Sequence, residues 1–402
     1  MTTAERAYTA LAYDTVTGRV LFELDLSAEP EWSSRINDVG GWKITVPLEG
    51  GAKTARVREW CVPWRFSVAI VRGRGAPADV VCQAGPIIPY APAADKPEHT
   101  VSGKGFWELL NRRVLHNLAW NPAAARITDA SADVYTTDSL PNIARGIVYH
   151  ATSMTYRPGS ALPVDLPTPA AAGTNFRRYY GYEMAMVGQR LQELTQVDGG
   201  PDVLFQPYLT VVGGLRYIRH RMLIGDPYLV QPGVPLLFDY RSSLVRLDIA
   251  GDGSDQANTA FVKGTGNEAG QLYGYATATA LTTAGWPMLD MVDSGHTSAS
   301  DQSTLDGWAT ADVALYNSQP EQWQATVLAD AEPRLGSYLP GHFADYSVKN
   351  HHWLKNGKYS YRILGVSNGP ERDKVLHQLQ AVRGPEWLRT HRSNAPGHRI
   401  SW

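Results

Sequence analysis

The chain has 402 residues, a formal net charge of −2 and only 19 % charged residues. This length allows two or three domains with separate cores. The chain has no excess of basic residues to neutralise phosphates, which disfavours nucleic-acid binding as a main role. It also has no basic amphipathic helix, which argues against binding to a membrane surface. The N-terminus lacks an apolar signal region, and the apolar runs are shorter than the roughly 18 residues of a membrane span. We therefore expect a chain that is made and folded in a cytoplasm.

Alternating apolar and polar residues, separated by turns rich in Gly and Pro, predict β-strands through the first hundred residues. In the clearest run, Trp42, Ile44 and Val46 alternate with polar or turn-favouring residues directly after a pair of glycines. The other runs are 8–14, 19–26, 61–73 and 80–87. Short strands at this spacing are typical of a sandwich or a barrel.

Helical periodicity then replaces the alternation. The predicted helices are 105–117, 182–197 and a third near 303–318, with Pro320 just past its end. Ser303 is expected to cap the third helix. The segment 156–181 is rich in Pro, Ala and Gly, which predicts a surface loop or linker.

Strand patterns return around the third helix, at 243–251, 258–264, 323–329, 359–366 and 374–382. Two faint echoes connect them with the first hundred residues. Segments 66–85 and 343–365 both run from a phenylalanine to a glycine through strand-like sequence, and TVSGKG (100–105) is similar to FVKGTG (261–266). The echoes predict that one β unit occurs twice, with the second copy split by the third helix.

The chain contains two cysteines, Cys61 and Cys82, in neighbouring strand-like runs. Their spacing permits a disulfide. A reducing compartment favours free, packed thiols instead.

Two glycine-rich segments, 103–105 and 264–270, resemble phosphate loops only superficially. Neither has the GxGxxG spacing or a GK[ST] ending, and neither opens a helix after a parallel strand. Glycines at strand ends explain both segments better.

Residues 248–259 partly match a calcium loop. Asp248, Asp252 and Gly253 occupy positions 1, 5 and 6, but Ala250 and Thr259 occupy positions 3 and 12, which require oxygen ligands including a bidentate Glu. A polar turn is the better interpretation.

His351 and His352 are adjacent, so in a strand they would point to opposite faces and could not chelate one ion together. No HExxH, CxxC or GxSxG motif occurs elsewhere. The simpler interpretation of His351 and His352 is that they lie in a surface loop.

The 12 Trp and 20 Tyr residues leave one enzymatic alternative open, a carbohydrate cleft. Glycoside cleavage needs two carboxyl groups about 5 to 10 Å apart. The candidates are Asp239, Asp248, Asp290 and Asp293. The sequence places no two of them together, so we predict no catalytic, cofactor or metal site.

The order of these pieces resembles a known family. The resemblance covers nearly the whole chain, and it rests on the order and spacing of weak motifs. These are YDTVTGRVLFELDL, WSSRINDVGGWKITVPL, VVCQAGPI, VSGKGFWELLNRRVL, GGPDVLF, SDQANTAFVKGTG, GWPMLD, STLDGWATADVAL and GSYLPGHFADYSV. The chain is similar to minor tail proteins of siphophages that infect actinobacteria, of the tail-hub (baseplate-hub) type. Cys82 departs from the family pattern, in which Trp is common.

The resemblance implies a mainly β fold with a few helices (α+β). It implies a first β-barrel hub domain at 1–103, a helical and irregular connecting region at 104–243, and a second β-barrel hub domain at 244–384. A helix inserted near 303–318 would interrupt the second barrel, and 385–402 would be a C-terminal tail.

The resemblance further implies a non-enzymatic homotrimer at the virion tail tip, assembled in the host cytoplasm. The ring would link a hexameric tail, through the distal tail protein above it, to further tip or receptor-binding proteins below. Its channel would pass the tape-measure protein and then DNA. The alternative is a carbohydrate-binding or carbohydrate-cleaving tail component that acts on the host envelope.

Overall fold

The protein is described by a computed structural model. It describes residues 7–48, 57–92, 96–124, 126, 130–157, 159–197, 199–233, 236–240, 242–267, 270–297, 299–317 and 321–381. The tail expected at 385–402 lies outside these residues. Compactness divides the chain into two units: unit 1 consists of Met1–Leu247 and Gln324–Trp402, and unit 2 is Asp248–Trp323.

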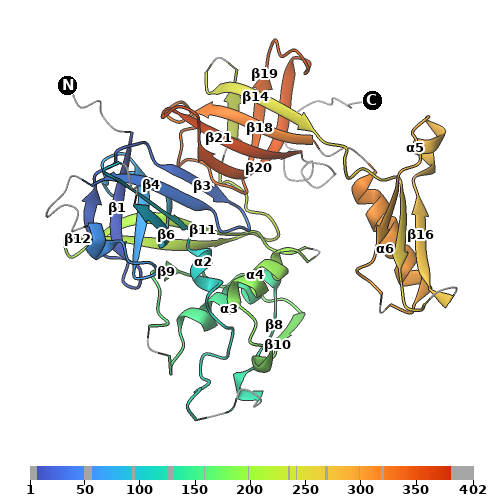
Figure 1. The fold of residues 1–402 in the computed structure, drawn as a ribbon, viewed down its shortest axis with the longest axis horizontal. Coiled ribbons are helices and arrows are strands. Elements are labelled where there is room, and N and C mark those ends of the chain that lie inside the picture. Colours follow the sequence, from blue (N-terminus) through green and yellow to red (C-terminus); the bar gives the residue numbers. More distant parts are fainter. Residues whose placement is uncertain are drawn as a thin grey trace. The chain divides into compact units, whose positions relative to one another are not determined.

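A thirteen-stranded sheet forms the frame of unit 1 (Figure 1). Its first seven strands are β1 (Tyr8–Asp14), β2 (Val20–Leu24), β3 (Glu31–Arg35), β4 (Gly41–Pro47), β5 (Phe66–Arg72), β6 (Val80–Pro92) and β7 (Glu98–Lys104). The remaining six are β13 (Leu236–Asp239), β14 (Leu244–Gly251), β18 (Glu321–Leu328), β19 (Phe343–Val348), β20 (Gly357–Asn368) and β21 (Lys374–Ala381). The mainly β class predicted above is confirmed.

Strand β4 shows why the alternating pattern was informative. Trp42, Ile44 and Val46 are buried, whereas Lys43 between them is exposed. The strand pairs with β3 on one side and β7 on the other, so its apolar set faces the core over its whole length.

Two glycines allow the antiparallel neighbours β6 and β7 to approach each other closely. A Cβ atom on Gly85 would lie 1.9 Å from the carbonyl oxygen of Lys104, and one on Gly103 would lie 2.1 Å from that of Pro86. Only a residue without a side chain fits at either position.

The strands do not form the two barrels that the resemblance implies. Along the sheet the order is β14-β18-β21-β20-β3-β4-β7-β6-β5-β1-β2, with β19 beside β20 and β13 beside β19. A barrel requires its first and last strands to pair. Within the described residues no sheet closes in this way, because β20 pairs with β3 and joins both halves of the chain into one open sheet.

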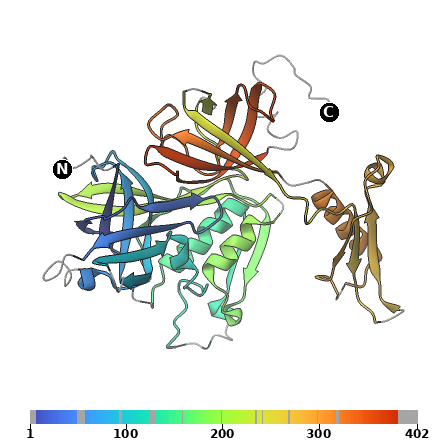
Figure 2. The same cartoon turned by 45° about the horizontal axis from the view of Figure 1, so that its top comes forward.

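The segment between β7 and β13 forms short helices that pack against a long hairpin (Figures 1 and 2). The helices are α2 (Trp107–Leu110), α3 (Leu140–Thr152) and α4 (Val187–Thr195), with 3-10 turns at Ala130–Ala132 and Gly181–Glu183. The hairpin pairs β11 (Val203–Val212) with β12 (Leu215–Ile224), and β9 (Val164–Asp165) joins β12. A separate ribbon pairs β8 (Val134–Asp138) with β10 (Asn175–Tyr179).

The helix predicted at 105–117 is wrong in length, since α2 ends at Leu110. Beyond it the backbone pairs with the segment before α4: the N–H of Leu115 donates to Ala185, and the N–H of Val187 donates to Arg113. These long-range hydrogen bonds replace the helical ones that the local pattern favoured.

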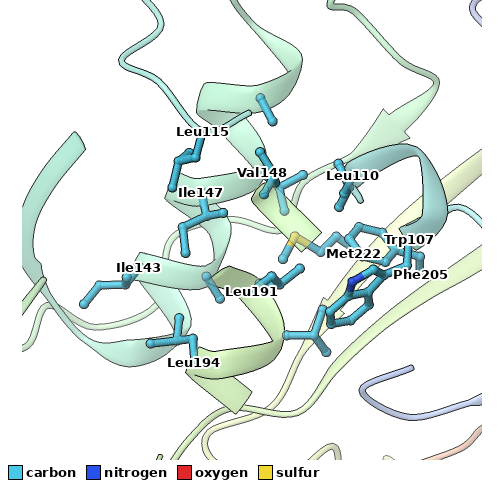
Figure 3. Close-up of a cluster of buried hydrophobic side chains, with 14 of the residues drawn as sticks. Trp107, Leu110, Leu115, Ile143, Ile147, Val148, Leu191, Leu194, Phe205 and Met222 are labelled. Atoms are coloured by element: carbon cyan, nitrogen blue, oxygen red, sulfur yellow. The ribbon is translucent and has the colours of Figure 1, made fainter. Parts of the chain in front are cut away.

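Figure 3 shows the core that holds this layer together. Ile143 and Ile147 of α3 meet Leu191 of α4, while Trp107 of α2 packs edge-on against Phe205 of β11 at 5.7 Å between ring centroids. All are buried, so the helices fix the hairpin through apolar contact.

Unit 2 is a small α+β module. The central strand β15 (Thr259–Lys263) pairs antiparallel with β16 (Tyr273–Thr277) and parallel with β17 (Asp290–Asp293). Helix α6 (Gln302–Tyr316) packs on this sheet, and the single turn α5 (Thr279–Thr283) follows β16. The cap of α6 is Asp301 rather than Ser303, because its carboxylate accepts the N–H of Thr304 at 2.8 Å.

The second sequence echo does not relate equivalent strands. TVSGKG lies on β7 in the main sheet, whereas FVKGTG begins on β15, the centre of the separate sheet of unit 2. None of the helices in the described ranges is long and apolar enough to cross a membrane.

Candidate assembly surfaces

The segment considered as a calcium loop is not arranged as one. Asp248 lies on β14, and the carboxylate of Asp252 accepts the N–H of Ser254 at 2.9 Å in an exposed turn. The hydroxyl of Thr259 lies 3.2 Å from that of Thr277 on β16. Across the described part of the chain, no three His, Cys, Asp or Glu side chains gather into a metal-binding group.

The carboxylates considered for glycoside cleavage are also dispersed. Asp239 ends β13 in unit 1. Asp290 and Asp293 lie on β17 in unit 2, three residues apart and therefore on opposite faces of the strand. Asp293 contacts the imidazole of His296 at 3.2 Å. Asp290 and Asp293 therefore do not face each other as an acid pair.

Both glycine-rich segments are strand ends. The N–H of Gly264 donates to Leu272 in the connection between antiparallel strands β15 and β16. Gly103 lies on β7, which leads into the four-residue helix α2. Neither segment begins a helix long enough to bind a phosphate group.

His351 organises a turn between β19 and β20. Its Nδ1 accepts the N–H groups of Trp353 and Leu354, both at 3.1 Å, and its Nε2 lies 3.1 Å from the carbonyl oxygen of Leu247. Because Nδ1 accepts, Nε2 carries the proton and donates to Leu247. His352 is exposed, so the pair does not form a chelating site.

Both cysteines are free and buried, which confirms the prediction of reduced thiols. Cys61 lies 3.2 Å from Nε2 of His99, and Cys82 lies on β6. Burial raises the pKa of Cys61 to about 11 and that of Cys82 to about 12. Neither thiol is therefore activated as a nucleophile near neutral pH.

A buried polar cluster joins three distant parts of unit 1. The carboxylate of Asp202 accepts from Asn37 at 3.4 Å, from the N–H of Leu229 at 2.7 Å and from the guanidinium of Arg362. Arg362 also stacks over Tyr228. The side chain of Asp202 is only 4 % exposed and that of Arg362 12 %. Charge-assisted hydrogen bonds thus connect the turn after β3, the residue before the hairpin and β20 at one point.

Unit 1 contains a cavity with a volume of about 280 Å³. Its wall combines apolar side chains such as Trp32 and Leu204 with polar ones such as Arg221. The only carboxylate in the wall is Asp79, so the cavity lacks the acid pair of a glycosidase.

The tip of the β11–β12 hairpin exposes aliphatic side chains. Val211, Val212 and Leu215 flank the glycine turn, and Val16 lies nearby because the N–H of Ile218 donates to Gly18 at 2.8 Å. These four side chains, here called the hairpin-tip patch, are each more than 40 % exposed. Val212 and Leu215 are direct cross-strand partners, whereas Val211 points to the other face of the hairpin. The sequence analysis missed this surface, although β-branched residues on both sides of Gly213–Gly214 are a hairpin signal.

Comparisons with known proteins found structural neighbours only. No family model and no curated protein matches the chain. The 43 kDa tail protein of prophage MuSo2 from Shewanella oneidensis superposes with a TM-score of 0.53 at 12 % identity, over 93 % of this chain and 98 % of that one. A tail protein from Neisseria meningitidis MC58 gives 0.49 at 12 % identity, over 93 % and 96 %. A chain of the p2 virion baseplate in its activated conformation gives 0.39 at 12 % identity, over 92 % and 98 %.

The chain therefore shares the fold of the Shewanella prophage tail protein over nearly the full length of both. The three structures named here are described as two tail proteins and a virion baseplate.

Proposed function

We propose that the protein is a structural component of a phage tail tip. Three copies form a hub ring that links the hexameric tail and its distal tail protein to further tip or receptor-binding proteins. The ring surrounds a channel for the tape-measure protein and DNA, in a siphophage that infects actinobacteria. The two halves of the main sheet, within 1–103 and 244–384, act as two similar wall segments in each copy.

The observation that carries the proposal is the shared fold with the Shewanella prophage tail protein over 93 % of the chain. The site geometry supports it. The candidate carboxylates, histidines and thiols are dispersed or engaged in structural contacts, whereas apolar side chains are exposed where subunits can meet. A scaffold needs rigid joints such as the Asp202–Arg362 cluster rather than reactive groups.

The channel wall should not be strongly basic. DNA must pass without being held, and clustered Lys and Arg would capture phosphates with salt-dependent affinity. The balance of 37 basic and 39 acidic residues is compatible with such a wall.

Immunogold labelling tests the assignment to the tail tip. Antibodies against the purified chain should label the distal end of virion tails. Labelling along the tail tube, on the capsid or on no virion structure would contradict the proposal.

The carbohydrate alternative is tested separately by thermal unfolding with cell-wall polysaccharide. A ligand that binds only the folded state raises the midpoint temperature. We expect no shift for this protein; a saturable upward shift would favour the alternative.

A further inference from the structure

Unit 2 carries an extreme charge. It contains ten acidic residues and a single basic one, Lys263, which gives a formal charge of −9. The remaining residues carry +7, because 36 basic residues outnumber 29 acidic ones. A compact module with charges of one sign attracts cationic surfaces over roughly a Debye length, about 8 Å at physiological salt.

One face of the unit 2 sheet is covered and the other is open. Helix α6 lies against the first face (Figures 1 and 2). It packs there through Leu305, Ala309 and Val313. The strand register places Phe261, Tyr273, Tyr275 and Val292 together on the second face. These four side chains form what is here called the aromatic face.

The aromatic face is built as a contact surface. Tyr273 is 56 % exposed, Tyr275 48 % and Val292 57 %. The ring of Phe261 lies between the two tyrosines, at 6.2 and 5.2 Å between centroids. Solvated faces of small sheets are ordinarily polar, so a cross-strand aromatic cluster on such a face indicates a partner.

Unit 1 presents a surface of matching chemistry at the turn between β19 and β20. Trp353 is 80 % exposed, and His351 holds its backbone through the hydrogen bonds described above. Lys349, Lys355 and Lys358 belong to the same segment, and all three are exposed and form no ion pair within the described residues. Residues 349–358 are here called the tryptophan turn.

We propose that the tryptophan turn of one copy docks on the aromatic face of unit 2 in a second copy. Trp is the residue most enriched at energetic hot spots, and the rings of the aromatic face can enclose it. The three lysines complement the charge of −9 and accelerate association. Each copy carries both surfaces, and because the two surfaces differ the contact is head-to-tail. Repeated head-to-tail contacts close into a ring when the rotation that relates successive copies allows closure.

This docking contact rests on the proposed function only in that both require several copies of the chain. Analytical sedimentation of the full chain, which measures self-association, tests the docking contact. Trp353→Ala and Tyr275→Ala should each raise the dissociation constant of self-association at least tenfold, and the double variant should weaken it little more than either change alone. Trp286→Ala and Tyr156→Ala, which remove exposed aromatic side chains elsewhere, should leave it unchanged.

Charge is tested with the triple variant Lys349→Glu, Lys355→Glu and Lys358→Glu. Wild-type association should weaken as salt is raised, and the variant should lose both affinity and most of that dependence. A chain that stays monomeric up to about 100 µM, or variants that associate like the wild type, would overturn the proposal.

Cross-linking identifies the occupant of the aromatic face. A photo-reactive residue at position 353, in a mixture of isotopically heavy and light chains, should give mixed-label cross-links to the peptide that contains Tyr275. Cross-links within one chain only, or to another tail protein only, would overturn the inference. A tail tip with three copies but without this contact would leave the proposed function standing.

Discussion

Asp202 and Arg362 form the ion pair on which the joint between the turn after β3, the residue before the hairpin and β20 depends. Removing one partner of a buried pair leaves an uncompensated charge, which typically costs about 3–5 kcal/mol. We expect Asp202→Ala to lower the free energy of unfolding by that amount in urea titrations. Glu31→Ala, which breaks the exposed Lys43–Glu31 pair, is the control and should cost about 1 kcal/mol or less. Equal effects of the two changes would show that the joint contributes little.

His377 gives stability a dependence on pH. It is fully buried beside the hydroxyl of Tyr346 at 2.9 Å, and burial lowers its pKa to about 3. The unfolded value is about 6.5, so the unfolded state binds the proton more strongly. The stability due to neutral His377 is therefore complete above about pH 6.5 and is lost as the pH falls towards 3.

We expect the free energy of unfolding of His377→Gln to fall less steeply than that of the wild type between pH 6 and 4. The difference should approach about 1.4 kcal/mol per pH unit. Urea titrations at several pH values measure it. An equal pH dependence of the free energy of unfolding in the variant and the wild type would contradict the role assigned to His377. Burial also lowers the pKa values of His220 and His342 to about 4, so part of the slope remains in the variant.

At the scale of elements, Gly85 allows the paired strands β6 and β7 to approach each other closely. Any Cβ there would collide with the backbone of Lys104, so Gly85→Ala must separate the strands. We expect a loss of more than about 2 kcal/mol. Gly146→Ala is the matched control: it lies in α3 with nothing within 4 Å of a new Cβ, and it should stabilise by about 0.5–1 kcal/mol. A stability of Gly85→Ala equal to the wild type would show that the strands can move apart freely.

Local sequence patterns correctly predicted those helices and strands whose tertiary packing agrees with the local preference. The alternation in β4 and the end signals around α6 predicted real elements, and each of the two packs one side on an apolar core. Helix α3 was missed, although Ile143, Ile147 and Ala151 repeat every four residues and Pro141 suits a first turn.

The main failures concern long-range pairing. The contact of β20 with β3 joins residues more than 300 positions apart, and no local pattern encodes it. It changed two expected barrels into one open sheet. Likewise, the sequence analysis predicted strand 258–264 and the helix of unit 2, but not that they form a separate module. Of the segment interpreted as a polar turn instead of a calcium loop, Asp252 does lie in an exposed turn, whereas Asp248 lies on strand β14.

At the scale of the whole molecule, unit 2 is an insertion between two neighbouring strands. It leaves unit 1 along β14 and returns along β18, and these strands are hydrogen-bonded neighbours. A short Gly/Ser linker in place of residues 252–319 should therefore preserve unit 1. We expect a single cooperative thermal transition within a few degrees of that of unit 1 in the full chain. Aggregation or loss of cooperativity would show that unit 2 is needed for folding.

The most direct test of the central claim is a cryo-EM map of the intact tail tip, reconstructed without imposed symmetry. Our account predicts three copies of this chain in one ring at the distal end, around an open channel whose wall is not strongly basic. Six copies in the ring, a channel lined by clustered Arg and Lys, or no density for this chain at the tip would contradict it.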